Sequence, residues 1–220
     1  MISSVRFQRF AAVIFDMDGV LVDSEPVHVD AMRQLLTPYG IPYTDEENAE
    51  FFGFTDPEVF RVLRVRYGLE PDDQVLTRRR TALLVRLTRE RTVPMPGVPD
   101  VPETLHGLGY RLAVASSSAL DVIHATVDVL GIAALFETLV SGLEVGRGKP
   151  APDIFVETAR RLGLPPGACL VIEDSRNGVR AAKAAGMACA AIPCPATRHE
   201  SFAEADWRLD ALPELLPILR

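Results

Sequence analysis

The sequence predicts an α/β fold: a core domain built on a doubly wound parallel sheet, with an inserted α-helical cap domain. Two features of the pattern predict it. Short apolar runs alternate with amphipathic segments that end at glycine, as in successive βαβ units. One long stretch, residues 23–92, breaks this alternation with helical patterns alone. A chain of 220 residues has room for one such core and an insert.

Four apolar runs are interpreted as strands that are buried on both faces, as in a parallel sheet. They cover residues 11–15, 111–115, 169–172 and 187–192. Three helical patterns fall between the later runs, and each is followed by glycine, the usual residue just past a helix end. These patterns cover residues 119–130, 153–162 and 175–185.

The stretch between the first two strands predicts a small helical domain. Its helical patterns cover residues 26–39, 56–67 and 72–91, and residues 92–97 are rich in proline and suggest a linker back to the core. We therefore expect a core of residues 1–22 and 93–220, and a cap of residues 23–92. A domain held by two connections is able to move as a lid.

Composition narrows the possible partners and location. The net charge is −7, so we expect neither nucleic acid nor an anionic membrane as a partner, and the run of three arginines at 78–80 is interpreted as a solvated helix face. Three cysteines without framework spacing favour a reducing compartment. The first apolar run is too short for a signal-peptide core, so we expect a cytoplasmic protein, as a monomer or weak dimer.

Two aspartates and a glycine directly follow the first apolar run. Asp16 and Asp18 are two residues apart and start on the same side of an extended chain, while Gly19 permits a sharp turn. Ligands of open α/β sheets bind outside the carboxyl ends of the strands. Carboxylates this close repel unless a cation neutralises them, and such oxygen ligands suit Mg²⁺. The alternative is a pair of solvated loop aspartates.

A second acidic group follows the run 169–172. Glu173 and Asp174 stand at the end of that predicted strand, and Ser175 comes next. Two acidic strand ends in one sheet favour a shared metal site. The alternative is structural, since Asp174 or Ser175 could cap the following helix.

Hydroxyl and ammonium groups complete the candidate site. Ser116 and Ser117 follow the run 111–115 and offer hydroxyls and amides to a phosphate, whereas Ser118 is the expected cap of the next helix. Lys149 is one of only two lysines and lies in a Gly/Pro-rich loop, where a compact ammonium suits phosphate and carboxylate contacts. The alternative for Lys149 is an ordinary surface position.

The order of these residues fits one mechanism. Asp16 attacks phosphorus to form an aspartyl phosphate, and Asp18 protonates the leaving oxygen and later activates water. Mg²⁺ between Asp16, Asp174 and the phosphate offsets the charge repulsion. Ser116 and Lys149 hold the phosphate oxygens.

The same residues resemble the four motifs of the haloacid dehalogenase superfamily. Residues 16–28, Asp-Met-Asp-Gly-Val-Leu-Val-Asp-Ser-Glu-Pro-Val-His, resemble the first motif. Ser116 resembles the second, Lys149 in Gly-Lys-Pro-Ala-Pro-Asp the third, and Glu-Asp-Ser at 173–175 the fourth. The segments Val-Leu-Val-Asp-Ser-Glu-Pro and Glu-Asp-Ser-Arg-Asn-Gly are most similar to the β-phosphoglucomutase-like branch, which also holds many sugar-phosphate phosphatases.

This resemblance implies a Rossmann-like core, a helical cap and Mg²⁺ as cofactor. It implies Asp16 as the nucleophile and Asp18 as the acid/base, with Asp18 also binding the metal through its main-chain carbonyl. Asp174 is implied as a metal ligand, and Glu173 as a direct or water-bridged ligand.

Three residues of the predicted cap are expected to contact the substrate: Glu25, His28 and Gly53, although His28 could instead have a packing role. The chain departs from the mutases of the branch in the loop around Gly53. It has Phe52 and Asp56 where a mutase carries basic residues that grip a second phosphate. An acidic group there would repel that phosphate, which favours simple hydrolysis.

The predicted function is therefore Mg²⁺-dependent hydrolysis of a small phosphorylated metabolite, a sugar or polyol phosphate, through an aspartyl phosphate. A phosphomutase is the main alternative. A dehalogenase would need neither Asp18 nor Mg²⁺, and a receiver-like switch would be shorter and lack Asp18 as a means of discharging the intermediate.

Overall fold

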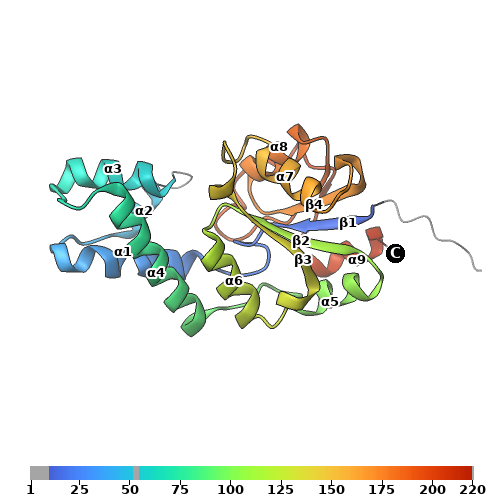
Figure 1. The fold of residues 1–220 in the computed structure, drawn as a ribbon, viewed down its shortest axis with the longest axis horizontal. Helices are drawn as coiled ribbons and strands as arrows, with labels where there is room; N and C mark the ends of the chain where they lie inside the picture. The colour runs from blue at the N-terminus through green and yellow to red at the C-terminus, as the bar shows by residue number, and fades with distance from the viewer. Residues whose placement is uncertain (1–9, 52–54, 220) are drawn as a thin grey trace, which may run out of the picture. The chain divides into compact units, whose positions relative to one another are not determined.

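The computed structural model describes residues 10–51 and 55–219. The chain divides into two compact units, one of residues 1–23 with 93–220 and the other of residues 24–92 (Figure 1). None of the helices in the described ranges has the length and apolar content needed to cross a lipid bilayer.

The first unit is built on one parallel sheet with the strand order β3-β2-β1-β4-β5-β6. The strands are β1 (Ala12–Phe15), β2 (Arg111–Ser116), β3 (Phe136–Ser141), β4 (Cys169–Glu173), β5 (Ala188–Ala191) and β6 (Trp207–Arg208). Phe15 at the end of β1 pairs with Val114 of β2 and Ile172 of β4. The residues that follow these three central strands therefore emerge at one edge of the sheet, and the predicted fold class is confirmed.

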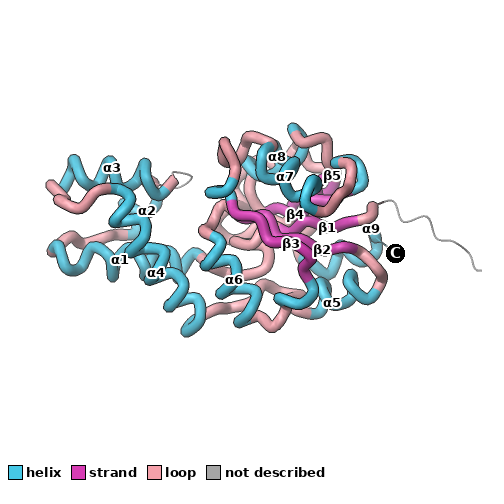
Figure 2. The backbone as a smooth tube through the Cα atoms, in the orientation of Figure 1, coloured by secondary structure: helices cyan, strands magenta, loops and turns pink. Residues whose placement is uncertain are grey.

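Helices cover both faces of this sheet, as Figures 1 and 2 show. Helices α7 (Asp153–Arg161) and α8 (Arg176–Ala184) lie on one face, and α5 (Asp100–Gly107), α6 (Leu120–Val129) and α9 (Leu216–Leu219) lie on the other. Short 3₁₀ turns cover Ala133–Leu135, Gly142–Glu144, Pro166–Ala168 and Leu212–Leu215. Apolar side chains such as Phe155 and Val171 are fully buried between α7, α8 and the sheet, which fixes the strand ends that carry the candidate site.

The second unit is a helical bundle with a core of its own. Its helices are α1 (Glu25–Leu36), α2 (Asp45–Glu50), α3 (Asp56–Tyr67) and α4 (Asp73–Arg91), with a 3₁₀ turn at Thr37–Tyr39. Phe60 and Leu63 of α3 pack with Leu76 of α4 at zero exposure. The sequence predicted three of these helices but not α2, which is too acidic to show an apolar period.

The interpretation of the arginine run 78–80 as a solvated face is wrong for its last member. The Arg80 side chain is only 12% exposed, and its Nη1 donates to Asp56 Oδ1 at 2.6 Å. Its Nη2 lies 3.0 Å from His28 Nδ1. Arg80 is thus held inside the bundle by a carboxylate and a histidine.

Candidate active site

The site begins where β1 ends. Asp16 is 6% exposed and its backbone N–H donates to Ile172 O at 2.9 Å, which ties it to β4. Gly19 follows with a φ of +75°, a backbone conformation that favours glycine. A Cβ on Gly19 would lie 2.3 Å from Asp174 Oδ2, so the missing side chain also lets this loop approach the end of β4.

Lys149 joins the ends of the central strands. Its Nζ donates to Asp16 Oδ1 at 2.8 Å, to Glu173 Oε1 at 2.6 Å and to the carbonyl of Ala115 at 3.3 Å. Burial by itself would lower the pKa of Lys149, but the carboxylates of Asp16 and Glu173 raise it above its ordinary value. The ammonium therefore stays charged and bridges two carboxylates, rather than lying free on the surface.

Both carboxylate oxygens of Glu173 are engaged, and the residue is fully buried. Oε1 accepts from Lys149, while Oε2 accepts from the backbone N–H groups of Asp174 and Ser175 at 3.1 and 3.2 Å and from the Ser175 hydroxyl at 3.0 Å. The Ser175 hydroxyl in turn accepts from Gly178 N at 3.1 Å and caps α8. Of the two capping candidates, Ser175 is the one that caps the helix.

Glu173 also packs directly against the backbone of α8 at Gly178, which leaves no space for a side chain at that position. A Cβ on Gly178 would lie 1.8 Å from Glu173 Cδ. We expect Gly178→Ala to lower the free energy of unfolding by about 3 kcal/mol, because the methyl displaces a buried, fully hydrogen-bonded carboxylate.

The matched control for this change is Gly107→Ala, at the last residue of α5, where no atom lies within 4 Å of the added Cβ. It should alter the free energy of unfolding in urea by about 1 kcal/mol at most. Equal unfolding midpoints for the two variants would contradict the packing described for Gly178.

Two serine hydroxyls hold Asp18. Ser116 Oγ and Ser118 Oγ donate to Asp18 Oδ2 at 3.2 and 3.0 Å, and Ser118 N donates to Ser116 Oγ at 3.1 Å. The expectation that Ser118 caps the next helix is wrong. The capping position of α6 is Ala119, whose methyl group cannot cap, and the Ser118 hydroxyl instead donates to Asp18. Ser117 lies between these two serines and is exposed.

Three carboxylates meet at the same edge of the sheet. One oxygen each of Asp16, Glu173 and Asp174 lies within 4.8 Å of the others. Burial raises the pKa of Asp16 well above its ordinary value, and the nearby carboxylates add to the rise although Lys149 opposes it. Burial and Glu173 raise the pKa of Asp174 to about 7. Carboxylates that resist ionisation side by side fit a divalent cation, which would neutralise them.

These raised pKa values predict a pH-dependent ion affinity. The Asp174 carboxyl, whose pKa is raised to about 7, holds a proton at lower pH that a divalent ion must displace, so affinity for Mg²⁺ should fall as the pH falls. We expect a loss of about tenfold or more between about pH 7.5 and pH 5.5. Calorimetry in buffers of different ionisation enthalpy measures both the affinity and the protons released. An affinity that is independent of pH, with no proton release, would contradict the assignment.

Three of the predicted substrate residues belong to the other part of the chain. In the unit of residues 24–92, Glu25 Oε1 accepts from Asn48 Nδ2 at 2.8 Å, and His28 contacts Arg80. Gly53 lies outside the residues that the structure describes. The residues that the structure does bring together are all in the core unit: Asp16, Asp18, Ser116, Lys149, Glu173 and Asp174.

Sequence reasoning missed Thr197 and Cys194, which lie beside Asp174. The Thr197 hydroxyl is 3.4 Å from Asp174 Oδ2, and the Cys194 side chain lies next to the same carboxylate. No motif marks either residue, and the only signal for Thr197 is its position in a loop after a buried strand.

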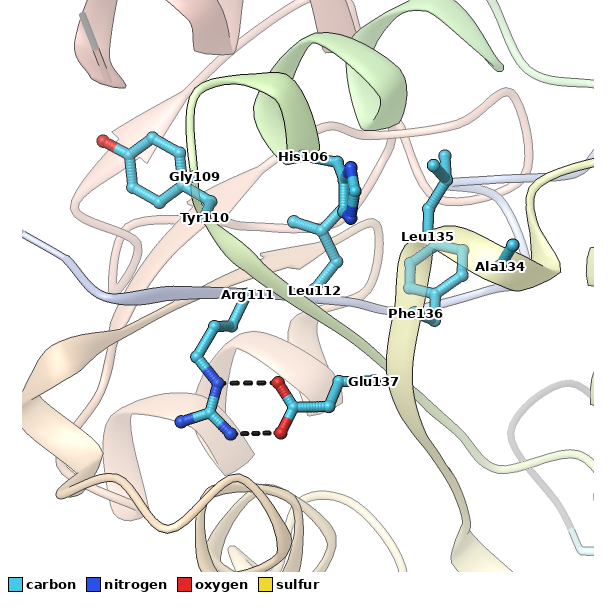
Figure 3. A pocket seen from close by; sticks show the side chains of 9 residues that line it. All are labelled: His106, Gly109, Tyr110, Arg111, Leu112, Ala134, Leu135, Phe136 and Glu137. Carbon is cyan, nitrogen blue, oxygen red and sulfur yellow. Dashed lines mark hydrogen bonds and ion pairs between the residues drawn. The ribbon is translucent and has the colours of Figure 1, made fainter.

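A separate cavity of about 390 Å³ lies at the opposite edge of the sheet, at the amino ends of β2 and β3 (Figure 3). Arg111 and Glu137, which line it, pair with each other, with Arg111 Nε donating to Glu137 Oε2 at 2.6 Å. No predicted site residue lines this cavity. It is therefore distinct from the carboxylate site.

Known proteins are similar to this chain in sequence. Residues 10–186 match the family model of haloacid dehalogenase-like hydrolases. The chain is 33% identical to fructose-1-phosphate phosphatase YqaB of Escherichia coli over 82% of this chain and 95% of that protein. It is 35% identical to the protein "Probable pseudouridine-5'-phosphatase" of Drosophila melanogaster over 93% of this chain and 90% of that protein.

Solved structures of the same family are similar to this chain in fold and sequence. The crystal structure of CbbY from Rhodobacter sphaeroides in complex with phosphate has a TM-score of 0.86 and 32% identity, and the match covers 94% of this chain and 96% of that one. A variant of the same protein was solved with xylulose-(1,5)bisphosphate. The chain therefore belongs to the haloacid dehalogenase-like hydrolases, in the branch of β-phosphoglucomutase-like proteins and sugar-phosphate phosphatases, and is a phosphoric monoester hydrolase.

Proposed function

We propose that this enzyme is a Mg²⁺-dependent phosphatase that hydrolyses a small phosphorylated metabolite, a sugar or polyol phosphate, through an aspartyl phosphate on Asp16. One observation carries the proposal. The buried Asp16 carboxylate lies 2.8 Å from the Lys149 ammonium and, with Asp174 and Glu173, forms a carboxylate cluster within 4.8 Å. A nucleophilic carboxylate, a fixed positive charge and a cation site are what this chemistry needs.

The reaction has two steps in this account. In the first, an oxygen of Asp16 forms a bond to phosphorus while the bond to the leaving oxygen breaks, and that oxygen takes a proton from Asp18. In the second, water gives a proton to Asp18 and attacks phosphorus, which releases phosphate and restores Asp16. Ser116 and Ser118 orient Asp18 through hydrogen bonds to its Oδ2.

The cation site and its neighbours have separate proposed roles. Mg²⁺ held by the Asp16 and Asp174 carboxylates and the Asp18 carbonyl would offset the negative charge of the site and of the phosphoryl group. Glu173 already uses both oxygens for Lys149 and the turn after β4. We therefore assign Glu173 to holding Lys149, with any contact to the ion made through water.

The cap is proposed to select the substrate. We assign residues 23–92 to the cap and residues 1–22 and 93–220 to the core, with Glu25, His28 and Gly53 contacting the substrate and Ser117 contributing to the phosphate cradle. Within the cap unit, Arg80 neutralises Asp56 at 2.6 Å, which reduces the repulsion expected from Asp56. Because the Arg80 guanidinium is already paired with Asp56, a second phosphate could bind to Arg80 only by breaking this ion pair. This favours substrates with one phosphate.

The test is a panel of phosphate esters assayed for phosphate release with Mg²⁺ and with EDTA. It contains fructose 1-phosphate, hexitol phosphates, pseudouridine 5'-phosphate, xylulose 1,5-bisphosphate and an aryl phosphate. We expect a sugar or polyol monophosphate to have the highest kcat/KM, at least about tenfold above the bisphosphate. Release that is unchanged by EDTA would contradict the role of the ion, and a preference for the bisphosphate would contradict the reading of the Asp56–Arg80 pair.

The phosphomutase alternative differs in where the phosphoryl group goes. A mutase would return it to a second hydroxyl of a sugar instead of to water. Interconversion of sugar phosphate isomers in the presence of a sugar bisphosphate, without net release of phosphate, would establish the mutase and overturn the proposed hydrolysis.

A further inference from the structure

The turn after β5 lies against the end of β4. Ile192 N donates to Glu173 O at 2.7 Å, which continues the pairing of the two strands by one residue. The chain then turns over residues 195–199. Two side chains of this segment, Cys194 and Thr197, reach Asp174.

Thr197 is the centre of this contact. It is 3% exposed, and its hydroxyl oxygen accepts from Cys194 N at 3.1 Å. The hydroxyl can donate its hydrogen to Asp174 Oδ2, 3.4 Å from Thr197 Oγ1, or to Cys194 Sγ, 3.5 Å away. The Cys194 side chain lies next to the same carboxylate. Asp174 is therefore contacted by two side chains that hydrogen-bond each other.

Backbone also lies against this carboxylate. Gly19 lies so near that a Cβ would come within 2.3 Å of Asp174 Oδ2. The carboxylate is thus contacted both by the loop that follows β1 and by the turn that follows β5. A ligand whose orientation is fixed before the ion arrives binds it more tightly, because less freedom is lost on binding.

We propose that Thr197 and Cys194 are positioning residues that hold the Asp174 carboxylate for a divalent ion. The inference rests on the proposed function, in which Asp174 is a metal ligand. The segment has a second attachment that does not involve this carboxylate: Glu200 Oε2 accepts from Arg176 N at 2.6 Å, at the start of α8. The turn therefore keeps an anchor when the Thr197 hydroxyl is removed, and loss of that hydroxyl need not unfold it.

The test measures Mn²⁺ binding to the full chain by the electron paramagnetic resonance signal of the free ion, without substrate. We expect Thr197→Val to weaken binding about tenfold, and Thr197→Ser, which keeps the hydroxyl, to stay within about twofold of the wild type. Thr126→Val is the matched control. Thr126 is also buried, and its hydroxyl donates to Val122 O at 2.9 Å within α6. Loss of this hydroxyl should leave Mn²⁺ affinity unchanged.

Cys194→Ala is the second variant, at a partly exposed position, and it should weaken Mn²⁺ binding by about threefold or more. Wild-type affinity in both Thr197→Val and Cys194→Ala would overturn the positioning role. Asp174→Asn tests the ion site itself. If it binds Mn²⁺ as the wild type does, the proposed metal site is wrong. If it loses the ion while the other two variants keep it, only the positioning inference fails.

Discussion

Replacing Asp16 with asparagine should abolish phosphatase activity and leave the fold intact. The amide cannot attack phosphorus, and one carboxylate of the cluster around Lys149 is lost. We expect kcat to fall by about 10⁴-fold or more. Phosphate release from the best substrate of the panel measures the loss, and circular dichroism with thermal unfolding checks the fold.

Asp128→Asn is the control for this variant. It makes the same chemical change at an exposed position of α6 and should keep wild-type kcat. An Asp16→Asn enzyme that turned over within a few-fold of the Asp128→Asn enzyme would remove Asp16 from the reaction.

The second large effect is expected for Asp18→Asn, which should slow the second step more than the first. Asparagine can neither accept the proton of the attacking water nor protonate a leaving oxygen, and kcat should fall by about 10²- to 10⁴-fold. An aryl phosphate has a good leaving group that needs little protonation. Its first turnover should therefore release close to one equivalent of phenol in a burst, followed by a slow steady state.

The double variant Asp16→Asn/Asp18→Asn is the control for that burst, because it lacks the proposed acceptor. Rapid-mixing absorbance should show no burst in it. A burst of equal size in the double variant, or a single variant that loses less than about tenfold in kcat, would contradict the role of Asp18.

Much of the fold could be predicted because the central strands are buried on both faces. The apolar runs at 11–15 and 169–172 correspond to β1 and β4, and the helical patterns at 56–67 and 72–91 correspond to α3 and α4. β3 could not be predicted in the same way. It is an edge strand whose first four residues are partly buried or exposed, and Phe136–Ser141 shows no continuous apolar run.

The meeting of the site residues could also be predicted, since parallel strands bring their carboxyl ends to one edge. The hydrogen-bond partners of these residues could not be predicted. Lys149 donates to both Asp16 and Glu173, and Ser118 donates to Asp18 instead of capping a helix. Such pairings depend on the directions of side chains in three dimensions, which spacing along the chain does not define.

The partners that come from distant segments were the hardest to predict. Thr197 becomes a neighbour of Asp174 only because β5 lies next to β4 and the chain turns back over the strand ends. Likewise, the Asp56–Arg80 pair joins the start of α3 to the middle of α4. The sequence of this loop alone does not show that the Asp56 carboxylate is paired with Arg80.

The most direct measurement of the central claim is to locate the covalent phosphoryl group. Asp18→Asn enzyme is mixed with saturating substrate, quenched in acid, digested and sequenced by mass spectrometry. The account predicts one added phosphoryl group per chain, on the peptide that contains residue 16 and on the Asp16 side chain. A phosphoryl group on any other residue, or turnover of this variant with no covalent adduct at any quench time, would contradict it.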